Sequence, residues 1–137
     1  MKLTMRERSE CFRGFLLLIA QDRVVAPEEK KLLCHIGKAL DFEQRFCEEA
    51  IDDLLENAHI AKDPPVFSRR EYAEAFLSDC IRIAGTEKEI HPEEWKWLNR
   101  IAEANSIPNT WVEEEVQKRV ERNTDIERDR MEIEAYI

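Results

Sequence analysis

Two pairs of acidic residues are the strongest candidates for chemistry in this sequence. Asp22 lies seven residues before Glu29, and Glu87 lies seven residues before Glu94. In each pair the first acid falls in a predicted bend, and the second falls in the first turn of the helix that follows. Carboxylate oxygens are the ligands that hard divalent cations such as Ca²⁺ and Mg²⁺ prefer in proteins. The four acids are therefore candidate ligands for a divalent cation.

A simpler interpretation explains the same acids as signals for a helix start. Pro27 and Pro92 precede Glu29 and Glu94 by two residues each. A proline at the first helical position loses no backbone hydrogen bond, and a glutamate in the first turn stabilises the helix dipole by ~0.3 to 1 kcal/mol. We favour this interpretation, because any stable helix start can show the pattern. Neither bend has the alternating Asp and Asn ligands and the central Gly of an EF-hand loop.

Other catalytic and cofactor motifs have little support. The three glycines are scattered, which excludes the common phosphate-binding loops with their clustered glycines. No Gly-flanked serine marks a nucleophile, and the histidines are isolated, with His91 expected to cap the next helix. We expect the four cysteines to be reduced and mostly buried, because they form no C-x-x-C pair and we predict no export signal. A zinc site of Cys34, His35 and Cys47 would need a convergence in space that the spacing does not encode. The sequence therefore predicts a protein that is not an enzyme; a small metal-dependent or carboxylate-based enzyme is the alternative.

The elements that must position these residues are predicted to be helices in a single compact domain, residues 1–137. With 3 Gly and 5 Pro, the chain has too few turn residues for a multi-stranded antiparallel sheet. Apolar periodicity and caps predict an all-α bundle of about seven helices. They lie near 5–21, after Pro27, and near 43–61, 69–84, 92–104, 108–122 and 125–135, with a linker at Lys62-Asp63-Pro64-Pro65.

Local signals refine the ends of the predicted bundle. Capping boxes are expected at Thr4-x-x-Glu7, Ser68-x-x-Glu71 and Thr124-x-x-Glu127. The last predicted helix carries only a thin apolar stripe, made of Ile126, Ile133 and Ile137. We therefore expect it to dock shallowly on the rest of the domain.

An internal repeat with an offset of 65 residues organises most of the chain. At this offset Pro27-Glu28-Glu29 falls on Pro92-Glu93-Glu94, and the apolar positions of the following helix coincide. The repeat predicts a duplicated three-helix unit, at about 9–51 and 73–116. A single unit cannot bury its helical faces alone, so the two units are expected to pack around an approximate twofold axis. This arrangement would bring the two acidic bends to one side of the molecule.

The three tryptophans lie in the second unit. Trp97 and Trp111 take the positions of Leu32 and Phe46 in the first unit, which predicts core positions for both. Trp95 takes the position of Lys30, so we expect it to be partly exposed. Helix packing is favoured for Trp95 over stacking against a ligand.

The repeated pattern resembles the TerB-like family of tellurite-resistance proteins. Both copies have a helix that ends in Ile-Ala, a short acidic loop, and Pro-Glu-Glu followed by Leu-x-x-Ile-x-x-Ala. The pattern is also similar to the N-terminal segment of certain membrane-linked DnaJ-type co-chaperones. The resemblance covers about residues 9–116. It implies an all-helical bundle with an acidic surface, associated with the stress response.

The bends depart from the family pattern at one position each. The family's loop carries Asp-Gly, then a hydrophobic residue and a later Glu. The first copy matches at Asp22 and Glu29 but has Arg23 in place of Gly, and the second has Lys88 in that place. Without Gly, a positive φ is harder to reach, which weakens the cation binding that the resemblance implies.

The charge balance restricts the partners. The chain has 30 Asp and Glu against 21 Lys and Arg, a net charge of −9, which repels phosphate backbones and anionic lipids. We expect no nucleic-acid binding, no membrane insertion and no secretory signal, hence a cytoplasmic protein. The predicted function is a non-enzymatic interaction module whose acidic face docks a protein partner or a divalent cation. The partner and the oligomeric state are left open by the sequence.

Overall fold

The computed structural model describes residues 2–19, 26–56, 63–84, 90–122 and 131–137. Within these ranges all the regular elements are helices and there is no strand, which confirms the all-α prediction. The six α-helices and the C-terminal 3₁₀ helix are α1 (Met5–Ile19), α2 (Pro27–Ala39), α3 (Gln44–Glu56), α4 (Arg70–Ala84), α5 (Pro92–Ala104), α6 (Asn109–Arg122) and η2 (Glu132–Tyr136). None of the described helices combines the length and apolar character needed to span a bilayer.

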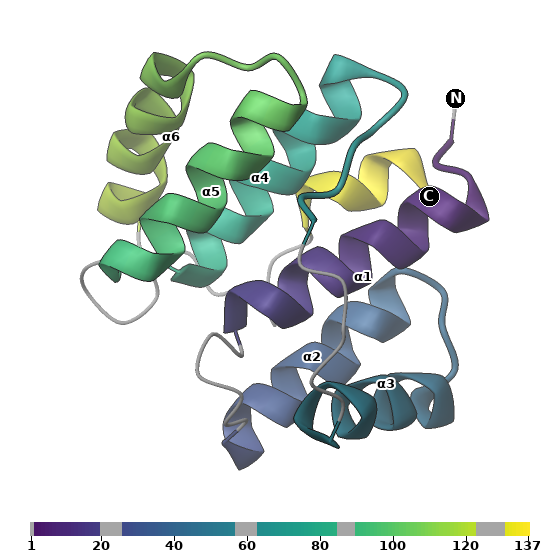
Figure 1. Ribbon diagram of the computed structural model, residues 1–137. Coiled ribbons are helices and arrows are strands. Elements are labelled where there is room, and N and C mark those ends of the chain that lie inside the picture. Colours follow the sequence, from purple (N-terminus) through teal and green to yellow (C-terminus); the bar gives the residue numbers. More distant parts are fainter. Residues whose placement is uncertain (1, 20–25, 57–62, 85–89, 123–130) are drawn as a thin grey trace.

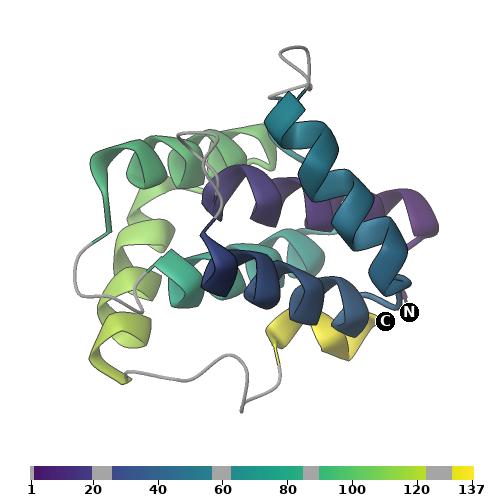
Figure 2. The ribbon, with the colours of Figure 1, turned by 90° about the horizontal axis from the view of Figure 1, so that it is seen from below.

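Helix α1 lies at the centre of the arrangement. It contacts α2 on one side and α4 on the other, so that the pair α2–α3 and the group α4–α6 lie on opposite sides of it (Figure 1). In the view from below, α3 crosses in front of α1 (Figure 2). The helices share one hydrophobic core, whose largest fully buried side chains include Phe15, Phe76, Leu33 and Leu98.

Two glycines allow neighbouring helices to approach closely. A Cβ atom on Gly14 would lie 2.5 Å from Cζ of Phe76, and one on Gly37 would lie 2.1 Å from Sγ of Cys47. Gly14 therefore fits α1 against α4, and Gly37 fits α2 against α3. Close packing of this kind leaves no space for even one extra methyl group.

Helix starts in the two halves follow one offset. Each start in α1–α3 lies 65 residues before its counterpart in α4–α6: Met5 and Arg70, Pro27 and Pro92, Gln44 and Asn109. The two non-glycine residues with positive φ among the described residues, Asp41 at 68° and Ser106 at 57°, have the same separation. The packing differs, because α4 contacts α6 directly whereas α3 packs mainly against α2. The local structure thus repeats at the predicted offset, and the duplication itself stays a prediction.

The C-terminal segment differs from its prediction. Of the helix expected at about 125–135, the part from 132 onward is a 3₁₀ helix, and 125–130 lie outside the described residues. Shallow docking is wrong for the described part, since Ile133 is fully buried and Met131 is 4% exposed. Hydrogen bonds hold η2 against the rest of the domain. Its backbone N–H groups donate to a buried carboxylate on α4, and Leu3 N–H donates to Tyr136 C=O at 2.7 Å.

Side-chain expectations for the core are met in most places. Trp97 is buried, as predicted. Trp111 was also predicted in the core but is only half-buried, whereas Trp95 is half-buried, as expected. All four cysteines are free thiols, and all but the half-buried Cys34 are buried. The capping box at α1 forms: Glu7 N–H donates to Thr4 Oγ1 at 3.1 Å, and Thr4 N–H donates to Glu7 Oε1 at 3.2 Å.

Candidate functional site

The two described members of the predicted cation site serve as helix caps. Glu29 Oε1 accepts the Ala26 N–H at 3.0 Å, and Glu94 Oε1 accepts the His91 N–H at 2.9 Å. His91 also caps α5, because its Nδ1 accepts the Glu93 N–H at 3.2 Å. These bonds agree with the simpler interpretation, in which the glutamates stabilise helix starts.

The other two predicted ligands, Asp22 and Glu87, lie outside the described residues. The helix ends that flank their bends can be placed. The ends of α1 and α4 and the starts of α2 and α5 lie at the same side of the molecule (Figure 1, left). In the part of the chain that the structure describes, no three His, Cys, Asp or Glu side chains are grouped to hold a metal ion.

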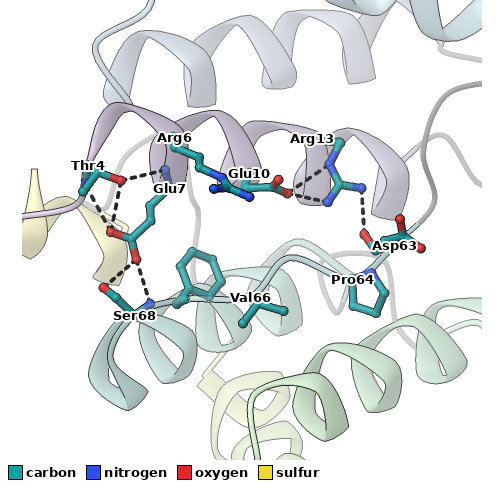
Figure 3. A pocket seen from close by; sticks show the side chains of 10 residues that line it. Thr4, Arg6, Glu7, Glu10, Arg13, Asp63, Pro64, Val66 and Ser68 are labelled. Atoms are coloured by element: carbon teal, nitrogen blue, oxygen red, sulfur yellow. Dashed lines mark hydrogen bonds and ion pairs between the residues drawn. The ribbon is translucent and has the colours of Figure 1, made fainter.

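A groove of about 630 Å³ lies between α1 and the extended segment 63–68 (Figure 3). The segment is extended because Pro64-Pro65 lacks the backbone N–H groups that a helix interior needs. The segment is also held by the side chain of Asn105. Its Oδ1 accepts the Phe67 N–H at 2.9 Å, and its Nδ2 donates to the Pro65 carbonyl at 2.8 Å. The groove is lined by Thr4, Arg6, Glu7, Glu10, Arg13, Asp63, Pro64, Val66, Phe67 and Ser68.

One carboxylate in this groove, Glu7, joins the start of α1 to the start of α4. Its Oε2 accepts both the N–H and the hydroxyl of Ser68 at 2.9 Å, and its Oε1 accepts from Thr4 (Figure 3). Burial raises the pKa of Glu7, but the hydrogen bonds from Ser68 and Thr4 outweigh it and hold the pKa below its usual value. The hydroxyl of Ser68 is thus bonded to Glu7, and the predicted capping box of Ser68 with Glu71 is replaced by this contact, which crosses from one helix to another.

The second carboxylate, Glu10, is also committed to a structural bond. It forms an ion pair with Arg13, whose Nη1 donates to the Asp63 carbonyl at 2.7 Å (Figure 3). Glu7 and Glu10, two of the three acids that line the groove, therefore help to attach the segment 63–68 to α1. The arrangement stabilises the connection between the two halves of the chain.

Asp79 on α4 is a fully buried acid, and the sequence pattern did not predict its role. Its two oxygens accept the Glu132 N–H at 2.7 Å and the Ile133 N–H at 2.9 Å, and Arg82 Nη1 lies 3.6 Å from Oδ1. Asp79 is 0% exposed, and burial raises its pKa to about 7 although the N–H donors and Arg82 lower it. Because η2 seals Asp79 from solvent, this carboxylate anchors the C-terminus and cannot meet a substrate. The one sequence signal for this role is the position of Asp79 as a single acid in the apolar second half of α4.

A second groove, of about 400 Å³, lies between α5 and α6. It is lined by Trp95 of α5 and by Thr110, Glu113, Glu114, Val116 and Gln117 of α6. Four of the α6 residues are spaced three and four positions apart, which places them on one helix face: Thr110, Glu113, Glu114 and Gln117. Glu113 and Glu114 are exposed, and neither belongs to an ion pair among the described residues. This groove combines an aromatic wall with exposed carboxylates.

The comparisons with known proteins leave the family open. No protein-family model matches the chain, and no curated protein or solved structure matches it either. The resemblance to the TerB-like family therefore stays a prediction from the repeated sequence pattern.

Proposed function

We propose that the chain is a non-enzymatic, TerB-like interaction module of the cytoplasm that docks a basic protein partner on its acidic surface. In this proposal the domain arose by duplication of a three-helix unit, and its cellular role belongs to the stress response. The 65-residue offset between the starts of equivalent helices supports the duplication.

The main support for this proposal is a set of exposed carboxylates on the third helix of each half. Asp52 and Asp53 on α3, and Glu113 and Glu114 on α6, are exposed and have no ion-pair partner among the described residues. Such charges add little to the stability of the fold. They attract a cationic partner and raise its association rate. The same charges oppose the binding of nucleic acid, whose phosphates carry the same sign.

The buried groups support a non-enzymatic role. Asp79 is sealed under η2, and burial raises the pKa of Cys11 and Cys80 well above its usual value. A protonated, buried thiol is a poor nucleophile. The perturbed pKa values of Asp79, Cys11 and Cys80 are thus explained by packing, and none of these three residues lines either groove.

A divalent cation is the second ligand that we propose, at the two acidic bends. Its support is the position of the four flanking helix ends at one side of the molecule (Figure 1). Calorimetric titration with Ca²⁺ and Mg²⁺ tests it, with Asp22→Ala and Glu87→Ala as variants. Heat that disappears in either variant supports a site at the bends, and no heat from the wild-type chain rejects the cation.

The protein-docking proposal can be tested with simple peptides. The ¹⁵N-labelled chain is titrated with deca-lysine and, as the control, with deca-glutamate, at low and at physiological salt. Deca-lysine should cause saturable shifts of amide signals from α3 and α6 that weaken as salt rises, because salt screens exposed charges. Deca-glutamate should cause none. A spectrum that deca-lysine leaves unchanged at low salt would overturn the proposal.

A further inference from the structure

The groove between α5 and α6 has two chemically different parts. Its apolar part consists of Trp95 and Val116, which are half-buried and pack against the hydrophobic core. Its polar part consists of the exposed Glu113 and Glu114 with neighbouring Thr110 and Gln117 on the same face of α6. A ligand that fits both parts needs an apolar stem and a positively charged end.

The aromatic wall favours a cation. The face of an indole ring attracts ammonium and guanidinium groups, by about 0.5 to 1 kcal/mol at exposed sites and more when the pair is desolvated. The same helix already shows this contact, since the guanidinium carbon of Arg100 lies 5.5 Å from the ring centroid of Trp97. Trp97 is buried and also donates from Nε1 to the Gly14 carbonyl at 3.2 Å, so its ring is engaged. Trp95 is the half-buried tryptophan that borders the groove.

The acidic rim favours the same ligand. The neighbouring Glu115 bonds to Ser78 and Lys118, whereas Glu113 and Glu114 have no ion-pair partner in the described part of the chain. Two unneutralised carboxylates beside an indole ring repel an anion and do not suit an apolar side chain. A bare metal ion would gain nothing from the apolar wall, and the groove of about 400 Å³ is much larger than such an ion needs.

Lysine and arginine side chains match both parts, because an aliphatic stem can lie on apolar surface while the charged head reaches carboxylates. We propose that the α5–α6 groove binds a lysine or arginine side chain of a basic peptide segment, with the stem on Trp95 and the charged head at Glu113 and Glu114. This inference rests on the proposed docking function and names the place on the acidic surface where a basic partner is held.

The test compares two pairs of charge-removing substitutions. Glu113→Gln with Glu114→Gln removes the rim of the groove. The control, Asp52→Asn with Asp53→Asn, removes the same two charges from the exposed surface of α3. All four side chains are exposed, so both double variants should fold. We expect the groove variant to weaken deca-lysine binding about tenfold and the control about twofold. The groove variant loses two direct contacts with the peptide, whereas the control loses only the long-range attraction of two surface charges.

A third variant and an NMR signal test the aromatic wall. Trp95→Leu should weaken binding by about fivefold, the loss expected for one exposed cation–π contact. In the wild-type chain the indole N–H signal of Trp95 should shift on titration with deca-lysine. A peptide in which every lysine is acetylated should leave that signal in place, because it keeps the stem and lacks the charge.

The outcomes separate this inference from the docking proposal on which it rests. Equal weakening by the two double variants, or an unmoved Trp95 signal, would overturn the groove and leave docking by the general acidic surface. A wild-type chain that does not bind deca-lysine at all would overturn both. Binding that fails only in the groove variants would support the groove.

Discussion

The buried carboxylate of Asp79 should make the stability of the domain fall as pH rises. Burial raises its pKa from the ordinary 3.8 to about 7 in the folded chain. The folded state therefore holds a proton on Asp79 over a range in which the unfolded state has already released it. Its contribution to stability is fully present below the unfolded pKa and is lost as pH rises through the folded pKa.

The size of this loss follows from the shift. A displacement of about three pKa units corresponds to about 4 kcal/mol, at about 1.4 kcal/mol per unit. Asp79 is fully buried, so solvent screening does not reduce the value. Asp79→Asn removes the titration while it keeps a similar shape and one oxygen acceptor for the N–H groups of η2. The variant should therefore gain stability relative to the wild-type chain as pH rises.

Urea unfolding followed by circular dichroism measures the effect. The free energy of unfolding of wild type minus that of Asp79→Asn should fall by about 4 kcal/mol between about pH 4 and pH 8. Other titrating groups are common to both proteins and cancel in this difference. A difference that stays constant over the range, or that grows with pH, would refute the placement of an ionisable carboxyl under η2.

Three further predictions concern packing and hydrogen bonding. Glu7→Gln should lower the free energy of unfolding at neutral pH by about 1 to 3 kcal/mol in a urea titration, because the amide replaces a charged acceptor of four hydrogen bonds with a neutral one. An unchanged midpoint would contradict that role. Gly37→Ala should cost about 1 to 3 kcal/mol in the same assay, because its Cβ would meet Cys47 Sγ at 2.1 Å, and a neutral result would show that α2 and α3 are less closely packed. Ile133→Ala should cost about 2 to 4 kcal/mol by leaving a cavity under η2, whereas a cost under about 1 kcal/mol would indicate the shallow docking expected from the sequence.

Local signals in the sequence predict much of the helical structure. Helix α5 has the predicted bounds, Pro92–Ala104, because a proline and a capping glutamate define its start. The start of α6 differs from prediction by one residue, as helix ends commonly do, and the predicted end of the first helix at Gln21 lies outside the described residues. These features depend on residues within one turn of each other, so they can be recognised without knowledge of the fold.

Contacts between distant parts of the chain could not be predicted in the same way. Ser68 was expected to cap its own helix, but its hydroxyl bonds to Glu7, 61 residues away. Asp79 bonds to the backbone of Ile133, 54 residues away. No periodicity or spacing encodes such pairs, because they depend on which helix faces meet in the folded chain.

The candidate groove was predictable only in part. The repeat places Trp95 at the position of Lys30, which predicts that its side chain is partly exposed, and the structure confirms this. The meeting of Trp95 with Glu113 and Glu114 depends on how α5 packs against α6. Glu29 and Glu94 lie in the first turns of their helices, as predicted, and each also accepts a backbone N–H at the helix start. Their partners in the proposed cation site lie outside the described residues.

The most direct test of the proposed docking is an intermolecular NOE experiment on the labelled chain with deca-lysine bound. The account predicts cross-peaks between the lysine side-chain methylene protons and the ring protons of Trp95, with none to the ring of buried Trp97. Cross-peaks confined to other parts of the surface, in a complex that is demonstrably formed, would contradict it.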